Sequence, residues 1–312
     1  MNYKRIIQSQ KLRFLILKFL AFVPDTIMLK WQYRIKMGRK LDLNSPQRYT
    51  EKLQLYKMYY RNPILFQCVD KYQVREYVAT KGLTSILNTL YGVYEDCKDI
   101  DWKVLPDSFV IKTTDGGGGE NIFICKNKSD LDIESVKSHL VGWKNKKDIN
   151  AGREWAYTGI TKSQYIIEEL LVNEDNPDAG ISDYKIFCFN GKPYCIVYDI
   201  DRYIGHKRNF YDTKWCCLNV SSDCPSFFDS GQKPKGLDDM LMVAEVLSAD
   251  FPFVRVDFAD FPFVRVDLYY IRNKVYFGEL TFYPWSGYVQ FNPDEFDFIL
   301  GKQFDISSFL PF

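Results

Sequence analysis

The segment "SFVIKTTDGGGGENIFICK", from Ser108 to Lys126, says more about the fold than any other stretch of the sequence. Two short apolar runs flank four consecutive glycines, Gly116 to Gly119. Apolar runs bounded by a glycine cluster predict two strands joined by a loop. Glycine offers no side-chain packing and loses much backbone entropy on folding. A folded protein therefore keeps four of them where the chain turns sharply or approaches a ligand closely.

The lysine that precedes the glycines, Lys112, shows which phosphate-binding patterns the loop does not follow. A Walker loop needs Gly-Lys-Ser/Thr at the start of a helix, a dinucleotide fingerprint needs GxGxxG, and the loop has neither. Its bare amides could still wrap phosphate oxygens beside Lys112. A flexible hairpin tip next to an ordinary strand lysine explains the same residues, so the segment alone leaves both interpretations open.

Length and composition predict a folded protein with one large or two medium domains. The chain has 312 residues, of which 46% are hydrophobic, so it can build a substantial core. Its 41 basic and 40 acidic residues create no overall field that would attract nucleic acid, and we predict no such partner. The eight cysteines form no CxxC pair and only two histidines are present, which favours reduced thiols over a zinc site.

The N-terminal residues 1–24 combine basic residues with the apolar run "FLILKFLAFV". This run is too short to span a bilayer, is interrupted by Lys18, and lacks a signal-peptide cleavage site. Two interpretations remain: a helix that packs its apolar stripe on the domain, or a basic amphipathic helix on an anionic membrane surface. We expect a cytoplasmic protein, with peripheral contact at the inner membrane face as the alternative.

Helical and strand-like segments alternate irregularly along the chain. A helix begins near Thr50, and a short one ends at Gly82, with Lys71 and Arg75 one turn apart on it. Strand-like segments follow from residue 108, with a hairpin turn at Asn190-Gly191 and helices at about 130–147 and 237–249. This mixture predicts an α+β architecture rather than a Rossmann domain.

The segment "IIEELLVNED" places two acidic residues, Glu168 and Glu169, at the end of an apolar strand. Adjacent residues on a strand point to opposite faces, so one of the two carboxylates faces inward and needs a hydrogen-bond donor. A ligand amino group or a lysine could supply that donor. A solvated glutamate beside a salt-bridged one is the simpler alternative.

The same nine-residue sequence occurs twice within residues 249–268, so that Arg255 and Asp257 recur as Arg265 and Asp267. The ten-residue step is even, and both copies would therefore show the same side chains to the same face of a sheet. Only the second copy runs directly into a predicted hairpin. The first copy would need a long bulge inside that hairpin, so we assign the function to the second copy.

The predicted hairpin turns at Arg272-Asn273 and carries Glu279 on its second strand. This turn brings Asp267 and Glu279 close across adjacent strands, within one register step. Two neighbouring carboxylates repel each other unless a cation lies between them, and their oxygens suit magnesium. Arg265, on the same face as Asp267, could instead neutralise the pair without a metal.

The order of these segments resembles the ATP-grasp superfamily. "FVIKTTDGGGGENI", "DYKIFCFNGKP", "HKRNFYD", "DFPFVRVDLYY" and "VYFGELTFYPWSG" resemble its TupA-like branch, found among teichuronopeptide, capsule and other surface-polysaccharide biosynthesis proteins. The resemblance covers residues 30 to 301 and implies an ATP-grasp fold in which two α+β subdomains clasp ATP. We expect an N-terminal helical extension at 1–50, a pre-ATP-grasp region at 51–105, the ATP-grasp core at 106–301 and a C-terminal tail at 302–312.

The resemblance also implies ATP and Mg²⁺ as cofactors and gives roles to particular residues. The implied nucleotide contacts are Arg75 (or Lys71), Lys112, Gly116, Gly117, Gly118, Gly119, Glu168, Leu171 and Asp175 (or Glu174). Within this set, Glu168 would meet the adenine amino group and the Leu171 backbone would meet the ring edge. Asp267 and Glu279 would hold magnesium, and Arg265 and Lys112 would steady the transferred phosphoryl group.

By the same resemblance, we expect an ATP-dependent carboxylate–amine ligase that forms an acyl phosphate. Its partners would be ATP and a carboxylate-bearing sugar or amino acid. The alternatives are a glycosyltransferase, a label that some members carry, an ATP-dependent sugar kinase and a nucleotide-binding scaffold without turnover. A glycosyltransferase usually needs a DxD metal motif, for which "DID" at Asp199–Asp201 is a weak candidate.

The duplication can be tested directly by two matched substitutions. Asp267→Asn should abolish ATP consumption because it removes a metal ligand from the hairpin strand, whereas Asp257→Asn should leave most of the activity. The measurement is the rate of ADP release by the two purified variants. Equal losses would refute the choice of the second copy.

Overall fold

A computed structural model describes residues 16–17, 19–117, 121–144, 152–173, 176–227, 232–249 and 261–310. Its longer helices are α3 (Asp25–Met37), α4 (Tyr49–Tyr59), α5 (Ile64–Val69), α6 (Val74–Thr80), α7 (Ile133–Lys144), α8 (Leu237–Ser248) and α9 (Glu295–Gln303). Its strands are β1 (Leu90–Tyr94), β2 (Phe109–Thr113), β3 (Ile122–Cys125), β4 (Tyr165–Glu168), β5 (Asp183–Phe189), β6 (Lys192–Ile200), β7 (Lys207–Asp212), β8 (Cys217–Leu218), β9 (Phe263–Ile271) and β10 (Lys274–Thr281).

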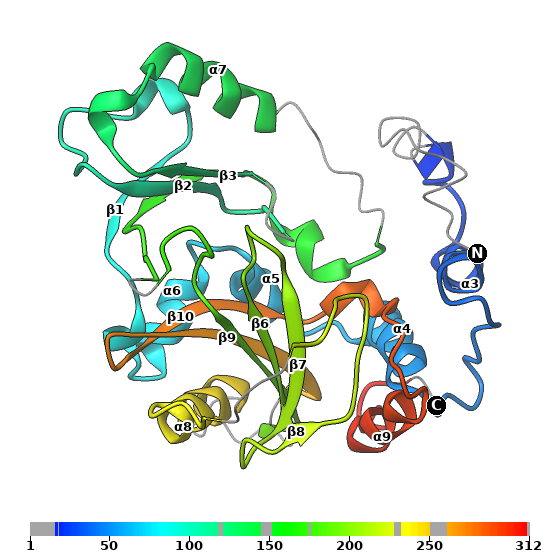
Figure 1. The fold of residues 1–312 in the computed structure, drawn as a ribbon. Coiled ribbons are helices and arrows are strands. Elements are labelled where there is room, and N and C mark those ends of the chain that lie inside the picture. The colour runs from blue at the N-terminus through cyan, green and yellow to red at the C-terminus, as the bar shows by residue number, and fades with distance from the viewer. Residues whose placement is uncertain are drawn as a thin grey trace.

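The strands form two antiparallel sheets that lie one above the other (Figure 1). The smaller sheet has the order β1-β4-β2-β3, and the larger has the order β10-β9-β5-β6-β7-β8. Helix α7 covers the outer face of the smaller sheet, and α8 lies against the outer face of the larger one. Mixed helices and antiparallel sheets confirm the predicted α+β class.

Each sheet buries one apolar face against its helix. Phe109 and Ile111 of β2 pack with Leu140 and Trp143 of α7. Beneath the larger sheet, apolar residues of α8 such as Leu247 join the same core as Val264 and Val266 of β9. Side chains alternate between the two faces of a strand. The residues before and after each helix-facing apolar residue therefore face the space between the sheets.

The two predicted hairpin turns of the larger sheet are confirmed. Strands β5 and β6 are joined at Asn190 (φ 49°) and Gly191 (φ 74°), and strands β9 and β10 at Arg272 (φ 52°) and Asn273 (φ 59°). Two consecutive residues with positive φ give a turn whose twist matches that of the paired strands. The registers of both hairpins follow from these short turns.

The predicted helices are also present, with one correction. Helices α7 and α8 occupy the two segments expected near 130–147 and 237–249, and α4 begins beside Thr50. The expectation that Lys71 and Arg75 share a helix is wrong, because Lys71 lies in the turn before α6. Asp70 caps that turn by accepting from the backbone N–H of Tyr72, so the helix starts later than predicted.

Within the described part of the chain, none of the helices combines the length and the apolar character needed to cross a bilayer. Helix α3 instead packs its inner face on the domain, where Leu29, Tyr33 and Met37 form a small apolar cluster with Leu41. The predicted membrane contact of residues 1–24 lies largely outside the described residues, which begin at residue 16.

Helix α4 contributes a buried lysine, Lys57, that is 1% exposed. Its Nζ donates hydrogen bonds to the carbonyl oxygens of Ser286 at 2.5 Å and Gly152 at 3.2 Å, and to Ser286 Oγ at 2.9 Å. Burial disfavours the ammonium ion and lowers the pKa of Lys57 from 10.5 to about 7. These hydrogen bonds hold the segment that contains Ser286 in place, and the desolvation of the amine opposes them.

The stability of the protein should therefore depend on pH through Lys57. Between pH 7 and 10.5 the unfolded chain holds a proton that the folded protein has lost, so the free energy of unfolding should rise with pH by up to about 1.4 kcal/mol per unit. The measurement is urea unfolding at several pH values. Lys57→Met should lack this component of the slope, and the exposed-lysine variant Lys103→Met should keep it. Identical slopes in Lys57→Met and the wild type would contradict the assignment.

Candidate functional site

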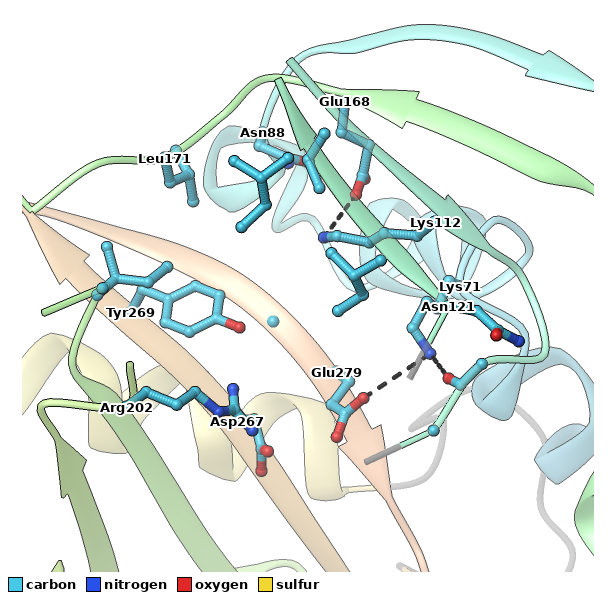
Figure 2. A pocket seen from close by; sticks show the side chains of 18 of the residues that line it. Lys71, Asn88, Lys112, Asn121, Glu168, Leu171, Arg202, Asp267, Tyr269 and Glu279 are labelled. Carbon is cyan, nitrogen blue, oxygen red and sulfur yellow. Dashed lines mark hydrogen bonds and ion pairs between the residues drawn. The ribbon is translucent and has the colours of Figure 1, made fainter. Parts of the chain in front are cut away.

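A cavity of about 1910 Å³ lies between the two sheets. Figure 2 shows its two sides: Lys112 and Glu168 come from the smaller sheet, and Asp267 and Glu279 come from the larger one. Lys71 reaches into the cavity from the turn before α6. The charged side chains that the sequence pointed to thus face one another across a single space.

On the smaller sheet, Glu168 is clamped between two cations. Its Oε2 accepts from Lys112 Nζ at 3.0 Å, and its Oε1 accepts from Arg75 Nη1 at 2.8 Å. Lys112 lies opposite Ile166, so Glu168 is two residues further along the same face of β4 and within reach of Lys112. Glu168 is 6% exposed, which confirms that one of the two adjacent glutamates faces inward.

The neighbouring acid, Glu169, also lines the cavity but has a different partner. Its Oε2 accepts from the hydroxyl of Thr89 at 3.0 Å at an exposed position. Arg75 is held in place by Asn88, whose side-chain oxygen accepts from Nη1 at 2.8 Å and whose carbonyl accepts from Nη2 at 2.6 Å. These contacts leave the Arg75 guanidinium aimed at Glu168.

On the larger sheet, Asp267 and Glu279 are directly opposed across β9 and β10, as predicted. A bulge at Gly278 shifts the register by one residue and brings the two carboxylates level. Glycine is needed at the bulge because a Cβ there would lie 2.8 Å from the carbonyl oxygen of Asp267. The local glycine therefore serves to pair two acids on the cavity face.

Arg265 neutralises part of this acidic pair. Its Nε and Nη2 donate to the two carboxylate oxygens of Asp267 at 2.6 and 2.5 Å, and Nη2 lies 3.5 Å from Glu279 Oε1. Thr281, opposite Arg265 on β10, accepts from Nη2 at 3.1 Å and lies 3.1 Å from Glu279 Oε1. The bidentate geometry is the strongest arrangement available to an arginine and a carboxylate.

Glu279 and Asp267 differ in their electrostatic balance. Burial acts to raise the pKa of Glu279, but Lys71, Arg265 and Lys185 outweigh it and hold that pKa below its ordinary value. For Asp267 burial is the larger effect and raises the pKa despite the nearby cations. The side chain of Glu279 is also 39% exposed and that of Asp267 only 3%. Glu279 is thus the ionised carboxylate that a ligand in the cavity can reach.

Lys71 connects the two sides of the cavity. Its Nζ lies 4.0 Å from Glu279 Oε2 and donates to the carbonyl oxygen of Gly116, the first residue of the glycine loop (Figure 2). The loop, the turn before α6 and strand β10 therefore meet at one ammonium group. At Gly117 an added Cβ would meet no atom of the described residues within 4 Å, so packing against those residues does not require glycine there.

Most of the predicted site residues line this one cavity. Those that do are Lys71, Arg75, Lys112, Gly116, Gly117, Glu168, Leu171, Arg265, Asp267 and Glu279. Gly118, Gly119, Glu174, Asp175 and the first copy of the duplication, with Arg255 and Asp257, lie outside the described residues. Strand β9 is formed by the second copy, as expected, and begins at Phe263.

The sequence reasoning missed a row of charges across the larger sheet. Lys185 of β5 lies opposite Asp267, and its Nζ is 3.3 Å from that carboxylate and 2.7 Å from Asp183. Asp183 in turn lies opposite Asp199 of β6, which lies opposite Arg208 of β7. Part of the signal was available: the charged residues of "DYK" are spaced by two and therefore share one face of a strand, whereas Asp199 is a single charge in the apolar run "CIVYDI".

The segment "HKRNFYD", one of the motifs that carry the family resemblance, forms strand β7. Arg208 is buried and donates to both oxygens of Asp199, at 2.6 and 3.0 Å, and to Asp223 at 2.7 Å. Its guanidinium also lies 5.1 Å from the ring of Trp285. Trp285 and Ser286 both line the cavity and adopt positive φ values, 49° and 56°, in the segment that Lys57 holds.

Comparison with known proteins gives a family match and distant structural similarities. Solved structures similar to the chain include D-alanine–D-alanine ligase from Bacillus anthracis (15% identity, 69% of this chain and 57% of that chain, TM-score 0.40). Others are N5-carboxyaminoimidazole synthetase from Staphylococcus aureus complexed with ADP (10%, 69% and 44%, 0.39) and phosphoribosylamine–glycine ligase from Thermotoga maritima (14%, 70% and 48%, 0.40). The chain spans about half the length of these proteins, and no curated protein matches it.

The family model described as TupA-like ATPgrasp matches residues 51–261 and 259–305. The two matched segments meet at the start of the second copy of the duplication, between α8 and β9. Together they include both sheets and every described side chain of the charged cavity named above. Because this match extends over far more than half of its length, the chain belongs to the TupA-like ATP-grasp family and has the α+β ATP-grasp fold.

Proposed function

We propose that the protein is an ATP-dependent carboxylate–amine ligase of surface-polysaccharide biosynthesis that works in the cytoplasm. The observation that best supports this is the meeting of cations and opposed carboxylates in one cavity, where Lys71 Nζ lies 4.0 Å from Glu279 Oε2. Family membership points to the same chemistry. Cations offset the charge of the transferred phosphoryl group, and carboxylates hold the metal that accompanies it.

The nucleotide would lie between the sheets, with its phosphates near Lys112, Arg75 and the glycine loop. Lys112 and Arg75 are bound to Glu168 in the structure. An ionised carboxylate offers about four acceptor positions, so Glu168 can keep both cations and still accept from an adenine amino group. Leu171, three residues further along, lines the cavity where its backbone would meet the adenine ring. Asp175 stays a predicted ribose contact.

Asp267 and Glu279 fit a magnesium ion that phosphates also bind. No group of three or more metal-binding side chains occurs among the residues that the structure describes. Magnesium often binds through one or two carboxylates and takes its remaining ligands from phosphates and water. Glu279 offers an exposed, ionised carboxylate beside Asp267, and Thr281 adds a hydroxyl. When bound, the ion would neutralise charge on the phosphoryl oxygens.

The proposed reaction has two steps that balance. An oxygen of the substrate carboxylate attacks the γ-phosphorus of ATP, and ADP leaves. The nitrogen of an amine then attacks the acyl carbon, phosphate leaves, and the nitrogen loses a proton to give the amide. Arg265 and Lys112 would steady the phosphoryl group during the first step, because fixed cations in a water-poor site stabilise charge as it develops.

The cavity has room for a second substrate beside ATP. Its volume of about 1910 Å³ exceeds the roughly 300–1,000 Å³ typical of a pocket for one small ligand. The residues that line it also include Arg202, whose side chain is 40% exposed, His206 and Trp285. A guanidinium and an aromatic face suit a carboxylate-bearing sugar or an amino acid, which are the substrate classes we propose.

The glycosyltransferase alternative is less well supported by the "DID" segment. Asp199 lines the cavity, whereas Asp201 is not among the described residues that line it and pairs with Lys207 at 3.4 Å, so the two carboxylates of this segment do not face one space as Asp267 and Glu279 do. A sugar kinase would use the same ATP site as the ligase. The products of the reaction therefore separate these alternatives.

The proposed function is tested by incubating the protein with ATP and Mg²⁺, amino acids, and glycans that carry uronic acids. The ligase should release ADP and phosphate only when both a carboxylate and an amine are present, with a product mass that shows loss of water. Release of UDP from a nucleotide sugar would indicate a glycosyltransferase. A phosphorylated sugar would indicate a kinase, and ATP binding without turnover would indicate a scaffold.

Lys112 should be far more important for turnover than a lysine at the rim of the same cavity. We expect Lys112→Met to lower kcat/KM for ATP by about 100- to 1,000-fold, the usual loss when one charge-stabilising donor is removed. The matched control is Lys126→Met, because Lys126 also lines the cavity but is 69% exposed and pairs with the exposed Asp178. The control should stay within about three-fold of the wild type. Similar losses in both variants would rule out a specific role for Lys112.

A further inference from the structure

Helix α3 presents an apolar stripe to solvent that no described part of the chain covers. Ile27, Trp31 and Ile35 follow one another at intervals of four residues and are 43%, 52% and 51% exposed. Residues four apart lie on one face of a helix, so the three side chains form a continuous stripe. Phe19 and Phe22, just before the helix, are 71% and 84% exposed. We call these five residues the α3 apolar face.

The opposite side of α3 is firmly attached to the domain, so the face is presented by a fixed element. Tyr33 and Gln32 point inward, where the Tyr33 hydroxyl lies 2.8 Å from Thr50 Oγ1 and Gln32 Oε1 accepts from Tyr288 at 2.7 Å. Arg153 donates to the carbonyl of Leu20 at 3.0 Å and pairs with Asp25 at 2.9 Å. These contacts fix the start of the helix.

Positive charge accompanies the apolar face. Lys30 and Arg34 are exposed and each precedes a residue of the stripe, whereas Asp25 is paired with Arg153. Residues 1–40 contain ten basic residues and one acidic residue. Since the whole chain has 41 basic and 40 acidic residues, the remaining 272 residues carry 31 basic and 39 acidic ones. The net charge is therefore +9 before residue 41 and −8 after it.

We propose that the α3 apolar face docks on a bilayer that contains anionic lipids. Exposed aromatic and aliphatic side chains would enter the boundary between headgroups and acyl chains, while Lys30 and Arg34 contact lipid phosphates. The acidic remainder of the chain is repelled by the same surface and would face away from it. Figure 1 places α3 beside α4 at one margin of the molecule, away from the smaller sheet.

The combination of features distinguishes a lipid surface from other occupants. A nucleic acid would use the positive charge but would leave a stripe of Ile27, Trp31 and Ile35 against its phosphates. A second copy of the chain would meet the apolar face with its own Lys30 and Arg34, and like charges would face each other across the symmetric contact. An anionic bilayer satisfies both the apolar residues and the basic ones.

The test is co-sedimentation of the full chain with vesicles. We expect binding to vesicles of equimolar phosphatidylglycerol and phosphatidylcholine, little binding to phosphatidylcholine alone, and release at about 1 M salt, where the Debye length is about 3 Å. Trp31→Ala/Ile35→Ala should weaken binding by at least about ten-fold. Lys30→Gln/Arg34→Gln should weaken it by about 25-fold, since each basic residue near an anionic surface contributes about five-fold.

The matched controls remove side chains of similar exposure and charge at positions away from α3. Val104→Ala/Met242→Ala removes two apolar side chains that are 70% and 56% exposed, and Lys98→Gln/Lys103→Gln removes two exposed lysines. Both controls should bind vesicles nearly as the wild type does, and all variants should keep the wild-type thermal unfolding temperature.

Quenching by brominated phosphatidylcholine, mixed into the anionic vesicles, locates the contact. The wild type should show quenching of tryptophan fluorescence that Trp31→Phe lacks. The proposal is overturned if the chain does not bind anionic vesicles, if the α3 variants bind as well as the controls, or if Trp31 escapes quenching. It is also overturned if the wild type forms a dimer that only the α3 variants lose, because the face is then an interface between two copies.

Discussion

The opposition of two carboxylates on neighbouring strands, Asp267 and Glu279, is the constraint on which the rest of the site depends. Like charges at this separation repel strongly where water is scarce, so the protein must bring cations to them. Arg265 supplies one from the same strand, Lys185 supplies one from β5, and Lys71 reaches over from the turn before α6. The last of these contacts also draws the glycine loop, and with it the smaller sheet, toward the larger sheet.

The larger sheet has two faces with opposite physical tasks. Its outer face packs apolar side chains such as Val264 and Val266 on α8 and stabilises the fold. Its cavity face carries Lys185, Asp199 and Arg208, each largely buried and each bound to an opposite charge. Buried ion pairs are seldom better for stability than well-packed apolar residues. A row of such pairs across three strands, on the cavity face of the sheet, therefore agrees with the binding surface that we propose.

Sequence reasoning predicted what depends on local patterns. Alternation and turn chemistry were sufficient for the β9–β10 hairpin, including the pairing of Asp267 with Glu279. What it could not predict depends on contacts between distant segments. The ion pairs of Arg75 and Lys112 with Glu168 join a helix to two strands. The sequence around Glu168 does not indicate which residues bind it. Lys71 was wrongly predicted to lie on a helix, because helix periodicity does not show that one turn ends at Asp70 and another begins there. The predicted domain boundaries stay predictions.

The duplicated segment is accommodated without disturbing this arrangement. The backbone N–H of Phe261 donates to the carbonyl of Ser248 at 3.2 Å, so the end of α8 and the approach to β9 are adjacent in space. The free-energy penalty for lengthening a connection between two adjacent points grows only slowly with its length. From Phe263 onward, β9 is in continuous register with β5 through to Leu268. The sheet therefore needs only one copy, and the one it uses is the copy that leads into the carboxylate pair.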